Sequence, residues 1–399
     1  MTVKKTTGSE LKPLARPVAE MRRSGIREVM DLAGTDPDVI HLEIGEPDFG
    51  TPAHIVEAAV AAAESGQTKY TANRGLASLR EALAAKLARA NGIDTDAEDI
   101  VVTTGGITAL AEALFTLVEP GDEILLPDPA WPNYAMLAGM LRARVVRYPL
   151  DRERGYEPDL DRLAELARSP AAKVILVNSP GNPTGAVWSR KTMERVYEIA
   201  CAANLYLLTD EVYEEIVFEG EHVSPAAFAD DGRVVSTFSF SKTYAMTGWR
   251  VGYVVASPAI AETIAKTQEA LVSCAVPVSQ KAAEAALLGP QDCVAQMRDA
   301  YRERRDVAVA ALRAHHLFVS EPQGAFYVVA DISAATDDTY GFARRLVAEH
   351  AVAVAPGETF GPAGAGLVRL SLAASRDSVE EGIRRLAEGV RQWHGGRAS

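Results

Sequence analysis

The chain has 399 residues, of which 48% are hydrophobic and 24% are charged, a composition typical of globular proteins and not of disordered or fibrous ones. Its formal net charge of −13 argues against a nucleic-acid-binding role, because phosphate neutralisation needs an excess of clustered Lys and Arg. The length predicts two domains.

Residues 1–45 form a polar, Arg-containing lead that ends in the turn-rich stretch LEIGEPDFGTP. We expect this lead to be an arm that also contributes to a smaller domain. From about residue 53 to 290, strand-length apolar runs alternate with amphipathic helical stretches. The strand candidates are residues 100–104, 122–127, 143–150, 173–180, 205–211, 234–241 and 251–256.

The first six strand candidates are separated by helix-length segments, so they should be parallel in one sheet. Only nine residues lie between Ser241 and Val251, fewer than a parallel crossover needs, so the seventh strand should be antiparallel. The expected fold class is α/β: a large domain over residues 46–290 with a mostly parallel seven-stranded sheet flanked by helices.

Residues 291–399 have an α+β pattern and are predicted to form, with the N-terminal arm, the smaller domain. The expected elements are a long charged helix over about 292–315, a hairpin over 317–332, a helix near 340–350, short strands over 351–357 and 366–373, and a last helix to about 394.

The cysteines, histidines and apolar runs exclude several other classes. Cys201, Cys274 and Cys293 are odd in number and scattered, which predicts neither a disulfide framework nor a metal site. His315 and His316 are adjacent but have no ligand spacing, so no bound metal is expected. Neither a signal-like segment nor an apolar run of about 18 residues occurs, so we expect a cytoplasmic protein that does not enter membranes.

Ligands of open α/β sheets bind beyond the carboxyl ends of the parallel strands. Gly105 and Gly106 open a helix after the first strand, where free backbone N–H groups and the helix dipole can meet a phosphate. An ordinary tight turn is the alternative interpretation, and the GxGxxG dinucleotide fingerprint is not matched.

Three further strand ends carry polar side chains. Asn182 follows the fourth strand in NSPGNPTG, Asp210 and Tyr213 follow the fifth in TDEVY, and Lys242 follows the sixth in SFSKTYAMTGWR. A solvated Asp and a surface Lys are the alternatives, but a buried acid needs a cation, and a desolvated lysine is the nucleophile that forms a Schiff base with a carbonyl cofactor.

These motifs, with GEPDF, KYT, TGG and RLS, occur in the order and spacing of the fold-type-I pyridoxal-phosphate aminotransferases, class I/II, of the aspartate aminotransferase superfamily. The chain resembles that family from LEIGEPDF to VRLSLA. The resemblance implies pyridoxal phosphate as cofactor and the transfer of an amino group between an L-amino acid and a 2-oxo acid by a ping-pong mechanism.

The resemblance also implies a role for each candidate residue. Lys242 would carry the cofactor as a Schiff base and move the substrate proton, Asp210 would pair with the pyridine nitrogen, and Asn182 and Tyr213 would hydrogen-bond the phenolic oxygen. Trp131 would stack on the ring, although a core aromatic is the alternative. The implied phosphate contacts are Gly105, Gly106, Ile107, Ser239, Ser241 and Arg250.

For the substrate, the resemblance implies that Arg369 clamps the α-carboxylate. Gly45, Trp131 and Asn182 would line the same pocket, and the two domains would close over the substrate. Tyr70, in KYTANRG, would reach the phosphate of a neighbouring subunit, so we expect a homodimer with shared active sites.

The choice of substrate and reaction stays open. Relatives that act on aspartate often carry a cation after the Gly pair, whereas Ile107 and Thr108 follow here and favour a neutral donor. An acidic donor remains possible through the arm's arginines, which are Arg16, Arg22, Arg23 and Arg27.

The same cofactor machinery also serves decarboxylases, lyases, racemases and amino-acid oxidases, which no motif here excludes. A transcription regulator would need a DNA-binding domain in front of the sheet, and the roughly 45 preceding residues are too few for one.

Overall fold

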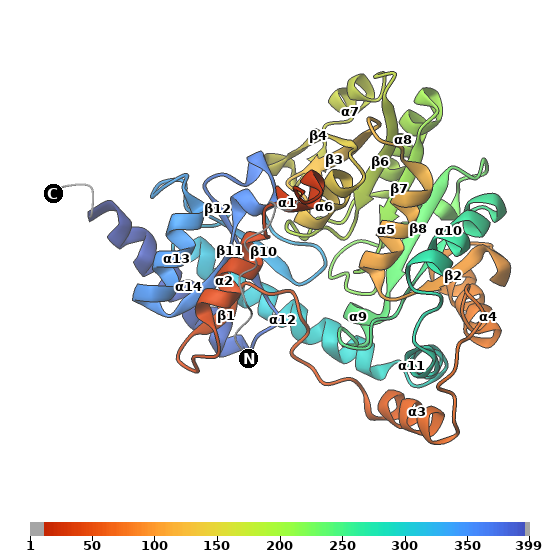
Figure 1. Cartoon of the computed structure of the whole chain (residues 1–399). Coiled ribbons are helices and arrows are strands. Elements are labelled where there is room, and N and C mark those ends of the chain that lie inside the picture. Colours follow the sequence, from red (N-terminus) through yellow and green to blue (C-terminus); the bar gives the residue numbers. More distant parts are fainter. Residues whose placement is uncertain (1–11, 396–399) are drawn as a thin grey trace, which may run out of the picture.

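The computed structural model describes residues 12–395, which contain two sheets, each covered by its own helices (Figure 1). The larger sheet has eight strands in the order β2-β9-β8-β7-β6-β3-β4-β5. Their bounds are β2 (Ile100–Thr103), β3 (Glu123–Asp128), β4 (Arg144–Asp151), β5 (Glu157–Pro158), β6 (Ala172–Asn178), β7 (Tyr206–Asp210), β8 (Val234–Ser239) and β9 (Gly252–Val255).

The strand directions confirm the expected α/β fold. The six strands predicted to be parallel run in one direction, and β9 is antiparallel to both of its neighbours, β2 and β8. The predicted count of seven strands was one too few, because the two-residue β5 pairs antiparallel with the end of β4. A segment of two residues is too short to show the alternation of apolar and polar residues by which strands are recognised.

Helices cover both faces of the larger sheet, because successive strand side chains point to opposite faces. Val101 packs with α5, α6 and α10, whereas its neighbours Ile100 and Val102 pack with α3, α4 and α11. Helices α7 and α8 cover the rest of that second face. The bounds are α3 (Ala53–Glu64), α4 (Ala77–Lys86), α5 (Gly106–Leu117), α6 (Pro132–Met140), α7 (Leu160–Leu166), α8 (Arg190–Ala203), α9 (Phe240–Thr243), α10 (Pro258–Leu271) and α11 (Pro277–Leu288).

The smaller sheet has four strands in the order β1-β11-β12-β10. Strand β1 comes from the N-terminal lead and pairs parallel with β11, so the lead is part of this sheet. The predicted hairpin has only one strand, β10, since Phe318 makes a single bridge to Ala330 where the other was expected. The bounds are β1 (Ile40–Leu42), β10 (Tyr327–Asp331), β11 (Val352–Pro356), β12 (Leu367–Ser371), α1 (Arg16–Ala19), α2 (Gly25–Ala33), α12 (Asp292–Ala314), α13 (Thr339–His350) and α14 (Arg376–Gly395).

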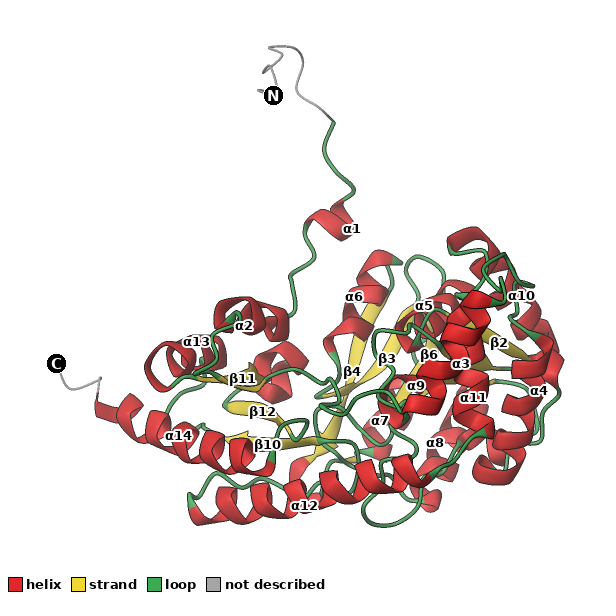
Figure 2. Ribbon diagram, turned by 90° about the horizontal axis from the view of Figure 1, so that it is seen from below, coloured by secondary structure: helices red, strands yellow, loops and turns green. Residues whose placement is uncertain are grey.

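Helix α12 joins the two sheet systems and runs along beneath them in the view of Figure 2. Its first turn packs Val294 into the core beside α11, and Leu312 near its other end lies in the core of the smaller sheet. Within residues 12–395, we find no helix with the length and apolar character of a bilayer span.

The reversed strand β9 lies directly against the turn that precedes α5. A side-chain carbon at Gly252 would lie 2.7 Å from the Phe238 carbonyl oxygen and 2.8 Å from both the Gly105 carbonyl carbon and the Gly106 nitrogen. Only glycine therefore lets β9 support this turn, which forms part of the site described below.

We predict that Gly252→Ala lowers the free energy of unfolding by about 1–3 kcal/mol, because the added methyl group overpacks three backbone atoms. Urea unfolding of the purified protein measures this change. The control is Gly139→Ala in α6, where the added carbon has nothing within 4 Å and should be neutral or slightly stabilising. Equal stability of Gly252→Ala and the unaltered protein would contradict the prediction.

Candidate active site

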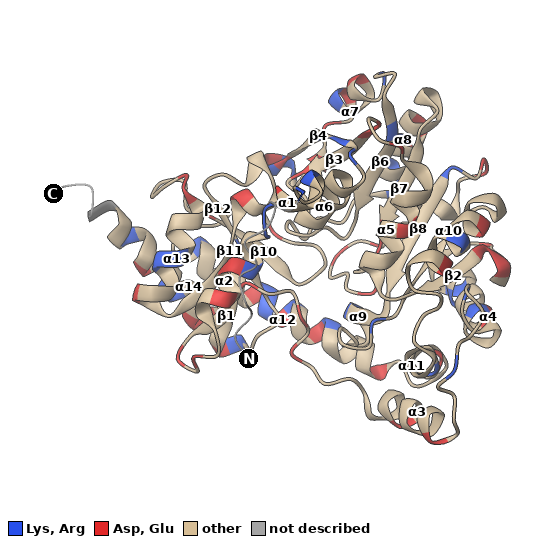
Figure 3. Cartoon of the chain, in the orientation of Figure 1, with Lys and Arg blue, Asp and Glu red and all other residues tan. Residues whose placement is uncertain are grey.

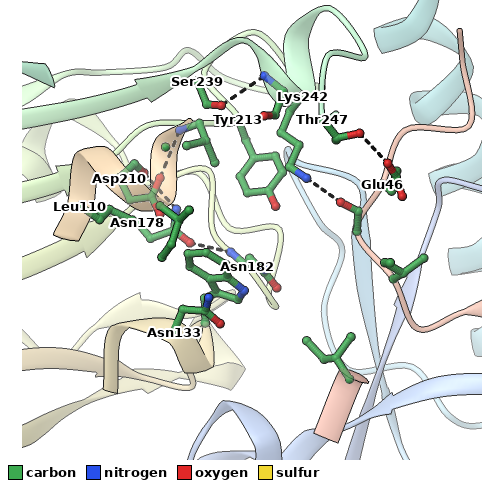
Figure 4. Close-up of a pocket in the computed structure, with 18 of the residues that line it drawn as sticks. Glu46, Leu110, Asn133, Asn178, Asn182, Asp210, Tyr213, Ser239, Lys242 and Thr247 are labelled. Carbon is green, nitrogen blue, oxygen red and sulfur yellow. Dashed lines mark hydrogen bonds between the residues drawn. The ribbon is translucent and has the colours of Figure 1, made fainter. Parts of the chain in front are cut away.

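A cavity of about 550 Å³ lies where the carboxyl ends of β6, β7 and β8 face the smaller sheet (Figure 4). It brings together residues from segments that are far apart in the sequence. All the predicted site residues line it except Gly105 and Tyr70; those that do are Gly45, Gly106, Ile107, Trp131, Asn182, Asp210, Tyr213, Ser239, Ser241, Lys242, Arg250 and Arg369.

Asp210, the last residue of β7, is a buried carboxylate on the floor of the cavity. It accepts a hydrogen bond of 2.5 Å from the Tyr134 hydroxyl, and among the described residues no cation forms an ion pair with it. Burial raises the pKa of the Asp210 carboxyl to about 6, while hydrogen bonds from the Tyr134 hydroxyl and the Val212 N–H oppose that rise. The site is therefore suited to a cationic ligand group.

Lys242 lies in the short helix α9 after β8, and its half-buried side chain extends into the cavity (Figure 4). Its Nζ donates a 2.5 Å hydrogen bond to the carbonyl oxygen of Gly45. Burial lowers the pKa of the Lys242 ammonium to about 8, and the Glu46 carboxylate opposes that fall. A lysine with this pKa is available as a nucleophile near neutral pH.

The amino-terminal end of α5 forms an anion cradle with Arg250 and two serines, Ser239 and Ser241. Gly105 has a φ of 91°, and a side-chain carbon there would lie 2.4 Å from Nη2 of Arg250. Arg250 is itself held by a 2.7 Å hydrogen bond from Nη1 to the Thr247 carbonyl oxygen. Although Gly105 is not among the lining residues, its lack of a side chain makes room for the guanidinium.

Arg369 of β12 is a buried cation on the opposite side of the cavity. Its guanidinium lies 4.3 Å from the centre of the Tyr327 ring and donates hydrogen bonds to the Asn182 side-chain oxygen, at 3.0 Å, and to the Glu43 carbonyl oxygen. Its Nε is buried and has no hydrogen-bond partner within residues 12–395. The side chain is thus fixed in place but retains a donor for a ligand.

Three cavity residues that carry much of this geometry were not predicted. Tyr134 lies in the first turn of α6, shortly after the carboxyl end of β3 and three residues after Trp131, so its position beyond a strand end was a signal that could have indicated it. Asn178 could have been found, because it belongs to NSPGNPTG, and it donates to the Asp210 carbonyl oxygen at 3.0 Å. Tyr327 reaches the site only through the packing of β10, and its hydroxyl lies 2.8 Å from that of Tyr213.

Some of the remaining lining residues come from the start of helix α2 and from the segment after β1. Beyond those already described, the cavity is lined by Ser24, Ile26, Arg27, Ile44, Glu46, Leu110, Asn133, Val212, Thr247 and Gly248.

Comparisons with known proteins cover most of the chain. The family model for aminotransferase class I and II matches residues 37–386. A probable aspartate aminotransferase of Methanocaldococcus jannaschii is 37% identical, over 91% of this chain and 96% of the relative. An arginine–pyruvate transaminase of Pseudomonas aeruginosa is 38% identical, over 88% of this chain and 89% of the relative. A solved structure of Thermus thermophilus aspartate aminotransferase with maleate is similar with a TM-score of 0.90 and 36% identity, covering 95% of this chain and all of that one.

We predict that Asp210→Asn makes the ligand-free protein more stable at pH 8, by about 3 kcal/mol. The folded-state pKa of about 6 exceeds the usual 3.8, so folding disfavours the ionised carboxyl, and the native protein loses stability as the pH rises through this range. The variant's advantage should therefore shrink as the pH falls below 6. Urea unfolding at several pH values measures it.

The matched control for this prediction is Asp94→Asn, which removes an exposed carboxylate. It should leave stability within about 0.5 kcal/mol of the unaltered protein at every pH. An Asp210→Asn protein that is less stable at pH 8, or an advantage that does not depend on pH, would contradict the assigned cause.

Proposed function

The chain belongs to the class I and II aminotransferases and is a transaminase, and we propose that it acts through pyridoxal phosphate bound in this cavity. The observation that carries the proposal is the juxtaposition of three features in one cavity. These are a buried carboxylate that forms no ion pair within residues 12–395, a desolvated lysine and an anion cradle.

The residues present fit that cofactor in charge and shape. The cradle of Gly105, Gly106, Ser239, Ser241 and Arg250 would hold the phosphate. A side-chain carbon at Gly106 would lie 3.1 Å from Val212 and 3.3 Å from Ser239, so even a methyl group there would crowd both neighbours. Lys242 would hold the cofactor covalently through Nζ. Trp131, Asn182 and Tyr213 line the space between and would contact the ring.

When bound, pyridoxal phosphate supplies an electron sink for the charge that develops at the substrate α-carbon. Asp210 is ionised above pH 6 or so, and its carboxylate keeps the ring nitrogen protonated by charge pairing. Tyr134 holds the Asp210 side chain in the required orientation through its 2.5 Å hydrogen bond. The Lys242 amine, with a pKa of about 8, moves the proton on and off the α-carbon.

Arg369 would bind the substrate α-carboxylate. The Asn182 side-chain oxygen accepts a hydrogen bond from Nη1 of Arg369, and both residues line the cavity. The two side chains would therefore bind the carboxylate as one unit. A charge-assisted hydrogen bond of this kind contributes about 1.5–3 kcal/mol. Because Arg369 belongs to the smaller sheet and Lys242 to the larger, we propose that residues 46–290 and 291–399 are domains that close over the substrate.

We further propose a homodimer in the cytoplasm. Tyr70 is 87% exposed and lies outside the cavity of its own chain, on a loop held by a 3.1 Å hydrogen bond from Gln280 Nε2 to the Thr71 hydroxyl and a 2.8 Å bond from Asn73 to Glu269. A firmly held loop that presents an exposed aromatic hydroxyl is suited to completing the phosphate site of a neighbouring subunit.

We predict that the purified enzyme with added pyridoxal phosphate shows a visible absorption band that borohydride bleaches. Lys242→Ala, purified in the same way, should lack this band because it has no amine to hold the cofactor. Lys191→Ala, which removes an exposed lysine outside the cavity, is the control and should keep it. A colourless wild-type enzyme would overturn the proposal.

The same preparations test the reaction. Incubated with a pool of L-amino acids and a 2-oxo acid, the wild-type enzyme should form a new amino acid, and Lys242→Ala should form none. Release of carbon dioxide or peroxide without amino transfer would contradict the proposed mechanism.

A further inference from the structure

A group of buried charged side chains lies on the face of the larger sheet opposite Asp210, and the steps above do not use it. Neighbouring residues of a strand point to opposite faces, so Thr209 points away from Asp210. The Thr209 hydroxyl donates to the Glu211 carboxylate at 2.5 Å, which places that carboxylate behind Asp210 as seen from the cavity. The group consists of Lys86, Glu211, Glu214 and His222.

Burial distinguishes this group from the charges on the surface. Charged residues of both signs are interspersed along the helices in Figure 3, and several form exposed ion pairs, such as Arg195 with Glu198. In the buried group, each side chain is 9% exposed or less, and none lines the cavity. A buried charge is costly unless it is paired, so each member needs a partner close by.

Glu211 and His222 are paired with one another. His222 Nε2 lies 2.8 Å from Oε2 of Glu211, whose Oε1 also accepts a 2.9 Å hydrogen bond from the Ser224 hydroxyl. Burial acts to raise the pKa of the Glu211 carboxyl, but the hydrogen bond and charge of His222 bring it below its usual value. Burial acts to lower the pKa of the His222 ring, but the hydrogen bond and charge of Glu211 raise it above the usual 6.5. At pH 6.5 the ring is therefore mostly protonated, and the pair carries little net charge.

The other two members form a separate ion pair. Lys86 Nζ donates to Oε1 of Glu214 at 2.6 Å. The charges of Lys86 and Glu214 change the pKa of His222 in opposite directions. The Glu215 carboxyl also faces His222, and burial followed by the charge of Glu214 raises its pKa. His222 Nδ1 is buried and has no hydrogen-bond partner within residues 12–395, so Glu211 is the group that orients the ring.

The backbone on both sides of Asp210 is fixed from this face. The Glu211 N–H donates to the Thr237 carbonyl oxygen at 2.9 Å, and the Thr237 hydroxyl donates to the Thr209 carbonyl oxygen at 2.8 Å. Together with the bond between the Thr209 hydroxyl and Glu211, these contacts set the direction in which the Asp210 side chain leaves the strand. Burial, and to a smaller degree the charge of Glu211, raises the pKa of Asp210, so an uncompensated Glu211 would oppose its ionisation.

We propose that Glu211 and His222 are positioning residues for Asp210: Glu211 fixes the end of the strand, and His222 neutralises Glu211 so that the Asp210 carboxylate ionises. Neither residue lines the cavity, so both act through Asp210. This inference rests on the proposed function, because it assigns the pair to the carboxylate that would meet the cofactor ring.

The first test uses the ligand-free protein and the stability that it gains from Asp210→Asn at pH 6.5. His222→Gln keeps a donor for Glu211 but removes the cation, so the ionisation constant of Asp210 should fall about three- to tenfold and the gain should be larger in that background. Glu211→Gln removes the anion, so the gain should be smaller. Urea unfolding of each variant with and without Asp210→Asn measures both gains.

Glu194→Gln is the matched control, since it removes an exposed carboxylate of α8 and should leave the gain unchanged. A purely structural role would change the gain in the same direction in the His222→Gln and Glu211→Gln backgrounds. Equal gains in every background, or changes of the same sign, overturn the inference. These measurements use no cofactor, so a chain that fails to bind pyridoxal phosphate would overturn the proposed function and leave this test intact.

The cofactor-loaded enzyme gives a second readout. His222→Gln and Glu211→Gln should each lower kcat about 3- to 10-fold and leave KM for the amino donor within about threefold, because neither residue touches the substrate. Glu194→Gln should change neither constant. An unchanged kcat in both variants, or a loss that appears only in KM, overturns the inference.

Discussion

The backbone of residues 43–46 touches both cations on which the site depends. The Glu43 carbonyl oxygen accepts from Arg369 of the smaller sheet, and the Gly45 carbonyl oxygen accepts from Lys242 of the larger one. Position 45 needs a glycine, because a side-chain carbon there would lie 1.9 Å from the Tyr327 hydroxyl. This segment therefore sets how Arg369 and Lys242 lie relative to one another.

The cavity shifts the pKa values of two groups from their ordinary values, in opposite directions. Burial raises the pKa of Asp210 and lowers that of Lys242, since each loses hydration without gaining a full ion pair. Such groups lower the free energy of unfolding of the ligand-free protein. A ligand that brings the missing charge offsets this loss. The preorganisation that suits catalysis is thus opposed to the stability of the empty protein.

Elements defined by local pattern were predictable from the sequence, and contacts made by packing were not. The reversal of β9 followed from the short connection after Ser241, and the cavity residues at the ends of β6, β7 and β8 followed from the parallel sheet. Tyr327 lies on β10, whose approach to the site depends on tertiary packing, so no local signal marked it. The substrate side of the cavity, which involves helix α2 of the N-terminal lead, was harder to predict for the same reason.

The two sides of the cavity differ in how tightly their residues are constrained. Around Asp210, hydrogen bonds from Tyr134 and Asn178 hold the carboxylate and its backbone carbonyl, and Gly252 lies directly against the Gly106 backbone. At the start of α2, the Gly25 N–H bond, the Ser24 cap and the Ile26 cluster fix the backbone, whereas the exposed Arg27 side chain forms no ion pair within residues 12–395. Because Ile26 packs with Phe360, and the Phe360 ring lies 5.1 Å from the guanidinium of Arg369, the position of helix α2 is coupled through one aromatic ring to the position of Arg369.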